Sequence, residues 1–471
     1  MENKKIIQLT NERRTFIFIN LVVSGIATSI LSTAMTTALP SLVEYYGVGT
    51  SIGQWVTSGY SLVMGMVMPL TAFLITRFPT KKLYMTGIGC FIAGLLFSIF
   101  SGNFGFMMVG RVLQACGNGV LVSAAQVIIL TVYPVEKKGT MMGTYGLATT
   151  AAPIIAPTVA GLMIDAFGWK SIFYLVMVIM IISLVVSGIV FEDVLEIQDK
   201  KFDMLSFVES IFAFGGITLG IGNISSFGLI SIQAGIPLLI GAVTCALFII
   251  RQCGLEKPFL DVKILSNWNY AISVVSSMVL YLVMMGSSVM MPLYVQSVMG
   301  YSAVVSGLVT LPGSFATAVV SPFAGRLYDK MGIKKIFMAG SAALLVSNIG
   351  MFFLTMNTPI WVAAGFNVIR NISIGSLMMP LLTWGTSNVT PKKVADASSL
   401  LTSFRTIAGS IGSAVFVGIM TVVSAGSVKD YGDNALMHGM NMSFFWMAVG
   451  SLVLIMISIF GTRNNAVSSE K

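Results

Sequence analysis

The stretch PFAGRLYDKMGIKK, residues 322–335, begins with proline near the end of a long apolar run and finishes with a basic cluster in a short loop. The stretch PLTAFLITRFPTKK, residues 69–82, has the same arrangement 253 positions earlier, and another apolar run follows each copy. An internal repeat of this kind predicts two related halves about a pseudo-symmetry axis. Such halves are common in secondary transporters, so the repeat predicts a substrate path between two helical bundles.

The composition predicts an all-α integral membrane protein. Apolar residues make up 56% of the 471 residues and charged residues only 10%, whereas soluble proteins carry about 25% charged residues. The excess apolar surface must therefore face lipid or other buried helices. The net charge of +9 does not indicate nucleic acid, because the basic residues lie in short loops between apolar runs, as expected for a membrane topology signal.

Fourteen apolar segments are long enough to be transmembrane helices, since a span needs roughly 20 residues. They lie near residues 15–38, 54–76, 83–101, 104–132, 140–163, 171–192, 204–223, 232–250, 269–293, 303–325, 336–355, 359–383, 398–424 and 441–461. The first follows a basic N-terminus and resembles a signal peptide, but its length indicates a retained helix.

The lysines and arginines predict that both chain ends are cytoplasmic. With the N-terminus inside, only Lys170 and Lys429 fall outside, and Arg111, Arg370 and Arg405 fall within spans. The remaining 22 lie inside: Lys4, Lys5, Arg13, Arg14, Arg77, Lys81, Lys82, Lys137, Lys138, Lys200, Lys201, Arg251, Lys257, Lys263, Arg326, Lys330, Lys334, Lys335, Lys392, Lys393, Arg463 and Lys471. A missed or invented span in mid-chain would break this bias, so it supports an even number of spans.

The repeat also orders the spans into domains. Pro69 closes the second span and Pro322 the tenth, so spans one to six correspond to spans nine to fourteen. We therefore expect an N-terminal six-helix bundle at 1–192, a linker and inserted helix pair at 193–266, and a C-terminal six-helix bundle at 267–471.

Neither a metal site nor an enzyme is predicted. Cys90, Cys116, Cys245 and Cys253 form no CxxC pair, and His438 is the only histidine. We interpret these cysteines as small apolar residues. The sequence has no Walker, GxSxG or HExxH motif, which argues against a self-contained ATPase, hydrolase or metalloprotease. No cofactor is expected.

The second repeat copy contains Gly325–Lys335 (GRLYDKMGIKK). It resembles the loop signature of the major facilitator superfamily, and nearly the whole chain is similar to its fourteen-helix drug:proton antiporters of the EmrB/QacA type. The resemblance implies that Gly325, Asp329 and Gly332 take part in gating between inward- and outward-open states. We expect Asp329 to complement the dipole of the helix that follows it. A purely topological anchor is the alternative.

The first repeat copy departs from this signature. Thr76 stands where an acid is expected and Pro79 where glycine is expected. This departure argues against a charge-based latch in the first half.

The fourth span reads RVLQACGNG from Arg111. It resembles the RxxQGxG signature of the superfamily, with Ala115 in place of the first glycine. An arginine within an apolar span is costly unless it faces protein, water or an acid, and Gln114 and Asn118 share its helix face. The resemblance implies that Arg111 takes part in proton coupling. Hydrogen bonding to backbone carbonyls alone is the alternative, and no acidic partner lies nearby in sequence.

The fifth span contains Gly146, Pro153, Pro157 and Gly161. It resembles the glycine- and proline-rich helix of antiporters in the superfamily, which implies export. Small residues permit tight packing and prolines bend a helix, so ordinary small-residue packing is the alternative.

The first span carries Leu31, where many relatives have aspartate, and the hydroxyls of Ser32, Thr33, Thr36 and Thr37. These hydroxyls can contact substrate or their own helix backbone. We take Thr33 and Thr36 as candidate cavity residues. The missing acid argues against the usual cation and proton site.

Further cavity candidates come from the second half. Arg370 lies within an apolar span near Asn367, as Arg111 lies within one near Gln114 and Asn118. Arg405 precedes a run of small residues. Both arginines are expected to point inward, because exposure to lipid would be expensive. Tyr281, with the methionines that follow it, could line an adaptable wall.

Intramembrane charge favours neutral or anionic amphiphilic substrates. Three arginines lie within spans, whereas Glu209 is the only acid clearly inside one, and it is expected to reach the cytosolic interface by snorkelling. A cavity for dicationic compounds would be expected to contain a carboxylate.

The function we expect is proton-driven efflux of hydrophobic or amphiphilic compounds by alternating access, in a cell membrane. The expected partners are such substrates, protons and the lipid bilayer, with no nucleic acid. An uptake or exchange permease for a small metabolite, and a non-transporting membrane sensor or assembly partner, are the alternatives.

Overall fold

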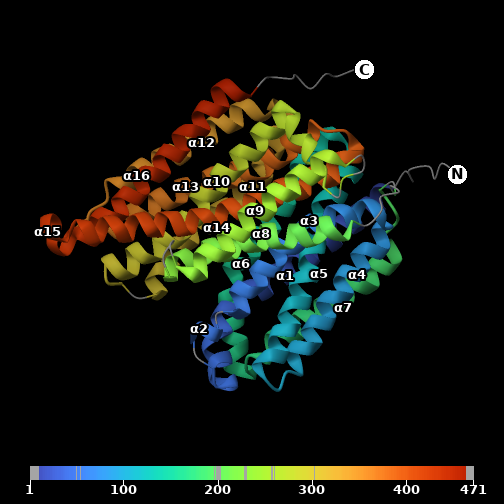
Figure 1. Ribbon diagram of the computed structural model, residues 1–471, viewed down its shortest axis with the longest axis horizontal. Coiled ribbons are helices and arrows are strands. Elements are labelled where there is room, and N and C mark those ends of the chain that lie inside the picture. The colour runs from blue at the N-terminus through green and yellow to red at the C-terminus, as the bar shows by residue number, and fades with distance from the viewer. Residues whose placement is uncertain are drawn as a thin grey trace.

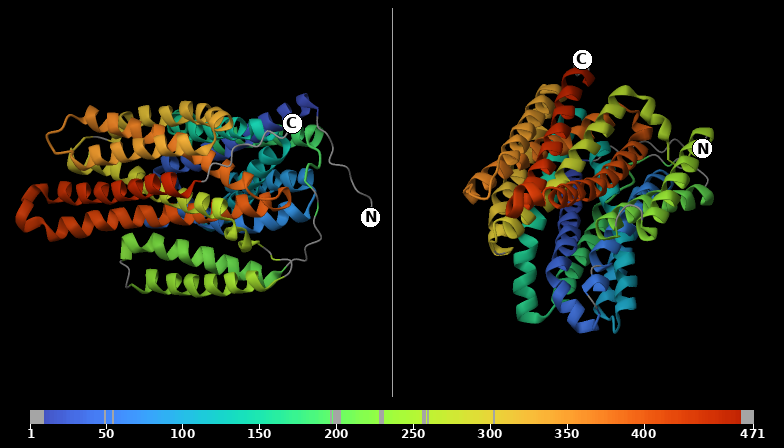
Figure 2. Two further views of the ribbon diagram at one scale, coloured as in Figure 1. Left: turned by 90° about the horizontal axis from the view of Figure 1, so that it is seen from above. Right: turned by 60° about the vertical axis from the view of Figure 1, so that its left-hand side comes forward.

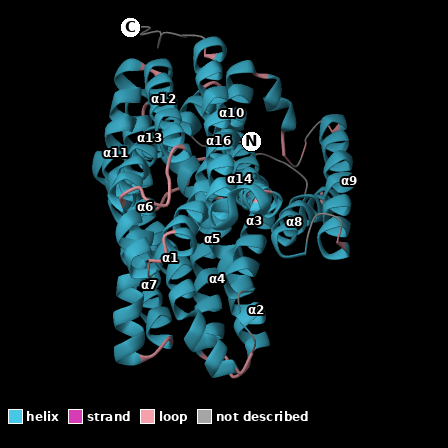
Figure 3. Ribbon diagram, turned by 90° about the vertical axis from the view of Figure 1, so that its left-hand side faces the viewer, coloured by secondary structure: helices cyan, strands magenta, loops and turns pink. Residues whose placement is uncertain are grey.

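The structure is a computed structural model that describes residues 10–48, 50–53, 55–195, 197, 203–227, 231–255, 258, 260–301 and 303–462. These residues form helices and loops (Figure 3). The α-helices are α1 (Asn11–Tyr46), α2 (Thr50–Gly53), α3 (Trp55–Arg77), α4 (Thr80–Ile99), α5 (Phe104–Val132), α6 (Val135–Phe167), α7 (Lys170–Val190), α8 (Met204–Phe227), α9 (Ile232–Gly254), α10 (Trp268–Leu293), α11 (Ala303–Met331), α12 (Ile333–Phe352), α13 (Ile360–Ser387), α14 (Val394–Gly426), α15 (Val428–Tyr431) and α16 (Ala435–Met456). Short 3₁₀ or π segments lie at Val262–Ser266, Tyr294–Val298, Pro391–Lys393, Gly432–Asn434 and Ile457–Gly461.

The chain is an all-helical membrane protein. Among the described residues, 12 helices are long and apolar enough to cross a membrane. The two other predicted spans coincide with α3, which has 23 residues, and with α6, which has 33. The total of fourteen spans stays a prediction.

Local capping explains where several helices begin. The side chains of Thr10, Asn103, Ser231 and Asn267 accept hydrogen bonds from the first-turn N–H groups of α1, α5, α9 and α10. Such caps satisfy donors that have no partner within the helix.

Helix neighbours follow the same order in two parts of the chain. In the first bundle (α1 and α3–α7), α4 contacts α5 and α7, and α1 contacts α6. In the second bundle (α10–α14 and α16), α12 contacts α13 and α16, and α10 contacts α14. Across the interface α6 meets α11 and α3 meets α14, which are the contacts that a two-fold axis would exchange.

The bundles are inclined to each other. Figure 1 shows them close together toward the chain termini and far apart at the ends that carry α2 and α15. Helices α8 and α9 pack on each other at one flank (Figure 2), and α8 contacts both α3 and α14.

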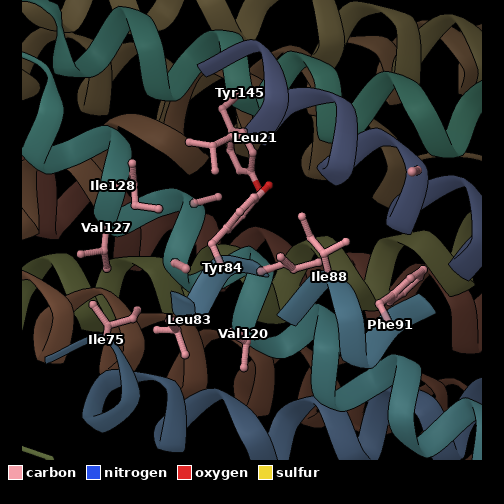
Figure 4. Packing of buried hydrophobic residues seen from close by; sticks show 14 of the residues in the cluster. Leu21, Ile75, Leu83, Tyr84, Ile88, Phe91, Val120, Val127, Ile128 and Tyr145 are labelled. Atoms are coloured by element: carbon pink, nitrogen blue, oxygen red, sulfur yellow. The ribbon is translucent and has the colours of Figure 1, made fainter. Parts of the chain in front are cut away.

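One apolar cluster fills the first bundle and continues into α10, α13 and α14 of the second, and another fills the rest of the second bundle. In the first bundle Tyr84 points toward Tyr145 among buried leucines, isoleucines and valines (Figure 4). The hydroxyl of Tyr84 is satisfied by a hydrogen bond of 2.5 Å with Ser24 Oγ. Burying a tyrosine ring in this way requires such a partner for its hydroxyl.

Helices α4 and α5 approach closely through glycines. A Cβ on Gly94 would lie 2.6 Å from the carbonyl oxygen of Gly110, and a Cβ on Gly117 would lie 2.7 Å from that of Gly87. Close backbone approach is a principal source of attraction between helices in lipid, where the hydrophobic effect is absent.

We predict that Gly110→Ala destabilises the protein, because its Cβ would lie 2.4 Å from Ser98 Oγ and 2.7 Å from the Gly94 carbonyl oxygen. Overpacking of this kind costs about 1–3 kcal/mol, so the melting temperature of the detergent-solubilised protein should fall. Gly89→Ala is the matched control, since no atom lies within 4 Å of its added Cβ. Equal melting temperatures for the two variants would contradict the proposed packing.

Candidate substrate cavity and its gate

A cavity of about 390 Å³ lies between the two bundles. Its walls come from α1, α3, α5 and α6 of the first bundle and from α10, α13 and α14 of the second. Its volume falls within the range of about 300–1,000 Å³ that is typical of small-molecule sites. The lining combines hydroxyl and amide side chains with four methionines, Met64, Met68, Met378 and Met379.

The structure brings some predicted cavity residues together and places others elsewhere. Thr33, Asn118, Tyr281 and Arg405 line the cavity, as does Pro153 of the proline-rich helix. Four candidates are not among the lining residues: Thr36, Gln114, Asn367 and Arg370.

The hydroxyls of α1 bond to their own helix. Thr33 Oγ1 donates to the Ser29 carbonyl at 3.2 Å, and Thr36 Oγ1 donates to the Thr33 carbonyl at 2.6 Å. Thr33 therefore presents lone pairs to the cavity, but not a free O–H. Leu31, the position of the missing acid, is buried in the apolar core of the first bundle.

Sequence reasoning missed several lining residues, including Tyr60, Gln126, Tyr145 and Thr402. Gln126 is eight residues after Asn118, and Thr402 is three residues before Arg405. These spacings place each on the same helix face as a predicted residue. Helical spacing from a known lining residue would have found both.

Arg111 is fully buried inside the first bundle, in a local polar network. Its Nε donates to the Val56 carbonyl at 2.9 Å and its Nη1 donates to Gln114 Oε1 at 2.6 Å. Gln114 in turn donates to the Gly94 carbonyl and Ser98 Oγ. Gln114 thus orients the arginine.

Tyr60 connects this network to the cavity. The guanidinium carbon of Arg111 lies 4.1 Å from the centroid of the Tyr60 ring, and Asn118 Nδ2 donates to the Tyr60 hydroxyl at 2.7 Å. Tyr60 and Asn118 both line the cavity. A ligand that contacts Tyr60 in the cavity is therefore separated from the Arg111 guanidinium by one aromatic ring.

Arg370 lies on α13, the helix that corresponds to α5 in the second bundle, and has a different environment from Arg111. It is 1% exposed, and within the described part of the chain none of its three side-chain nitrogens has a hydrogen-bond partner. Its guanidinium lies 5.5 Å from the centroid of the Phe444 ring on α16. The prediction that Arg370 avoids lipid is confirmed, because the residue is buried. It lies in the interior of the second bundle and is not among the residues that line the cavity.

Among the described residues that line the cavity, none is acidic. Glu209 is half-buried, and its Oε2 is covered and has no hydrogen-bond partner among the described residues. The expectation that Glu209 reaches the cytosolic interface stays a prediction. In the same described ranges no three His, Cys, Asp or Glu side chains could hold a metal ion.

Asp329 on α11 holds the two bundles together at the end predicted to be cytosolic. Its carboxylate accepts hydrogen bonds from the backbone N–H of Gly139 at 2.9 Å, the N–H of Thr140 at 2.7 Å and the Thr140 hydroxyl at 2.6 Å. The expectation that Asp329 serves the following helix was wrong. Its partners lie on α6 of the other bundle, because α11 crosses that helix.

Glycines allow this contact. A Cβ on Gly325 would lie 2.7 Å from the Gly139 carbonyl carbon, and a Cβ on Gly143 would lie 2.4 Å from the Ser321 carbonyl oxygen. The backbones of α6 and α11 therefore touch. Gly332 serves separately as the N-cap of α12 with φ +72°, a conformation that L side chains rarely adopt.

The other glycines and prolines of α6 differ in their surroundings. A Cβ on Gly146 would lie 2.8 Å from Met379 Cγ in the second bundle, whereas nothing lies within 4 Å of one on Gly161. The side chain of Pro157 lies outside the described residues.

The related contact between α3 and α14 lacks the acid on α3. The Thr76 hydroxyl donates to the Phe73 carbonyl of its own helix. Asp396, a buried acid near the start of α14, belongs to the second bundle. The two interfaces are thus alike in helix pairing and unlike in charge.

Comparison with known proteins agrees with this architecture. Residues 17–413 match the sequence profile of the Major Facilitator Superfamily. The chain belongs to the major facilitator superfamily. It is therefore a multi-pass membrane transporter and not an enzyme, and small molecules are its transport substrates.

Several superfamily members resemble the chain over nearly its full length. The uncharacterised MFS-type transporter YcnB of Bacillus subtilis (strain 168) is 31% identical over 444 residues, which cover 94% of each chain. The lincomycin resistance protein LmrB of the same organism is 29% identical over 461 residues, or 95% of each chain. The crystal structure of the human organic anion transporter MFSD10 matches with a TM-score of 0.67 at 12% identity, covering 96% of this chain and all of that one, which shows a shared fold.

We define the gate as the contact of Asp329 with Gly139 and Thr140 of α6. We predict that Asp329→Asn weakens this gate, because an amide cannot replace a carboxylate that accepts three hydrogen bonds. In a cysteine-free background, a Thr33→Cys reporter should react about fivefold or more faster with a membrane-impermeant maleimide added from the cytosolic side. Asp193→Asn is the matched control, since Asp193 accepts a bond from the Lys81 N–H within the first bundle. Unchanged reactivity in Asp329→Asn would rule out this gate.

Proposed function

We propose that this superfamily member exports hydrophobic or amphiphilic compounds in exchange for protons, as a fourteen-span antiporter of the drug:proton type. The strongest support for export is the cavity that both bundles line. The bundles are joined next to it by the contact between Asp329 and α6, which lies at one end of the molecule. The small, polar and methionine residues of the cavity suit varied ligands. The likeness to a protein named for lincomycin resistance points the same way.

Alternating access would follow from the two interfaces. Release of Asp329 from α6 frees the predicted cytosolic ends, and the bundles then rock about the cavity. The contact between Asp329 and α6 is made of three hydrogen bonds and close glycine contacts. Such a contact can exchange between formed and broken states at modest free-energy cost.

Proton entry would supply the energy, without a cofactor. One proton moving inward releases about 2.3 kcal/mol per 100 mV of membrane potential. Arg111 is our candidate for coupling, because a change at Tyr60 or Asn118 alters the surroundings of its charge. We place the protein in a cell membrane with both chain ends in the cytoplasm, as the basic loops predict.

The decisive experiment uses inside-out vesicles with an acidic interior and a dye that reports the pH gradient. Neutral, anionic and cationic amphiphiles are added in turn, with vesicles that lack the protein as control. Proton release that requires the protein supports antiport. If folded protein is present and no class responds, a permease with a narrow substrate range replaces this proposal.

We predict that Arg111→Ala abolishes substrate-driven proton release while protein still inserts into the membrane. Arg111→Lys keeps the charge but cannot reproduce the planar geometry that joins Val56, Gln114 and Tyr60, so it should retain only part of the activity. Size-exclusion profiles and melting temperatures verify that both variants are folded. Full proton release by folded Arg111→Ala would remove this residue from the mechanism.

A further inference from the structure

Arg405 has an environment unlike that of the other buried arginines. It is 5% exposed, it lines the cavity, and it is the only charged side chain among the described lining residues. Its Nε and Nη1 have no hydrogen-bond partner among the described residues. A buried guanidinium without partners is destabilising, so the free energy favours a ligand that supplies them.

Tyr281 fixes the orientation of this guanidinium. The guanidinium carbon of Arg405 lies 4.5 Å from the centroid of the Tyr281 ring, across the contact between α14 and α10. The N–H donors of a guanidinium lie in its plane, and Nε and Nη1 of Arg405 are covered and have no acceptor among the described residues. A carboxylate that reaches this guanidinium would supply acceptors in the planar geometry that arginine–carboxylate pairs use.

The remaining lining suits the rest of an amphiphile. Thr402 Oγ1 donates to Gln126 Oε1 at 3.3 Å between the two bundles, which leaves the amide NH₂ of Gln126 as a further donor. The four methionines of the cavity offer an apolar, adaptable surface for a hydrocarbon or aromatic body. A cation in the same place would face Arg405 with no carboxylate to offset the repulsion.

We propose that Arg405 is the anchor for an anionic group, and that the preferred substrates are amphiphiles with one carboxylate or sulfonate. That these compounds are transported rests on the proposed export function. That they bind at Arg405 does not, and it can be tested separately. Export of such an anion also moves negative charge outward, which an inside-negative membrane potential favours by about 2.3 kcal/mol per 100 mV.

Binding to purified protein in lipid nanodiscs tests the proposal without requiring transport. The probes share one skeleton: a dansyl-labelled C11 fatty carboxylate, its methyl ester and the corresponding trimethylammonium. Wild-type protein should bind the carboxylate about tenfold or more tightly than the ester, because hydrogen bonds to charged groups are the strong ones.

Substitutions at Arg405 then identify the anchor. Arg405→Gln should reduce the preference for the carboxylate to within about twofold and leave ester binding unchanged, and Arg405→Lys should be intermediate. Lys429→Gln, which removes a positive charge from the exposed helix α15, is the matched control and should keep the wild-type preference. Melting temperatures show that each variant is folded.

Two results would overturn the proposal: an Arg405→Gln variant that keeps the carboxylate preference, and a wild-type protein that binds the ester or the ammonium as tightly as the carboxylate. Failure of the export function gives a different result. In that case the carboxylate still binds through Arg405, but proteoliposomes neither move it nor release protons.

Discussion

The contact between Asp329 and the start of α6 is the interaction on which the working arrangement depends. It joins the bundles through one carboxylate and a glycine-lined backbone contact. Because the contact lies at one end, the bundles diverge toward the other end, where α2 and α15 lie (Figure 1). The cavity exists because the bundles are held at this end without being packed along their whole length.

The three arginines within the membrane-spanning helices have three different environments. Arg111 is held by a carbonyl, an amide and an aromatic ring. Among the described residues, Arg370 contacts an aromatic ring and has no hydrogen-bond partner, and Arg405 contacts a ring at the edge of the cavity. The first two lie within their own bundles and the third faces the shared cavity. A charge that is costly in lipid is tolerated where protein dipoles or a ligand can solvate it.

The two halves differ in their acidic residues although the chain contains an internal repeat. Asp329 and Asp396 both belong to the second bundle, and the first bundle has Thr76 on α3 at the position that corresponds to Asp329. The bundles therefore meet through matched helices with unmatched charges.

The amino-acid sequence was enough to predict the helical class, the order of the long helices, many of their ends and the superfamily. These depend on local properties, namely apolar length, capping residues such as Asn103, and loop motifs. Two features follow from the packing of distant helices: Asp329 bonds to α6, 190 positions away, and Arg405 rather than Arg370 lines the cavity. In a membrane protein the lipid-facing and buried sides of a helix are both apolar, so periodicity does not mark the inward face, and packing between distant helices decides it.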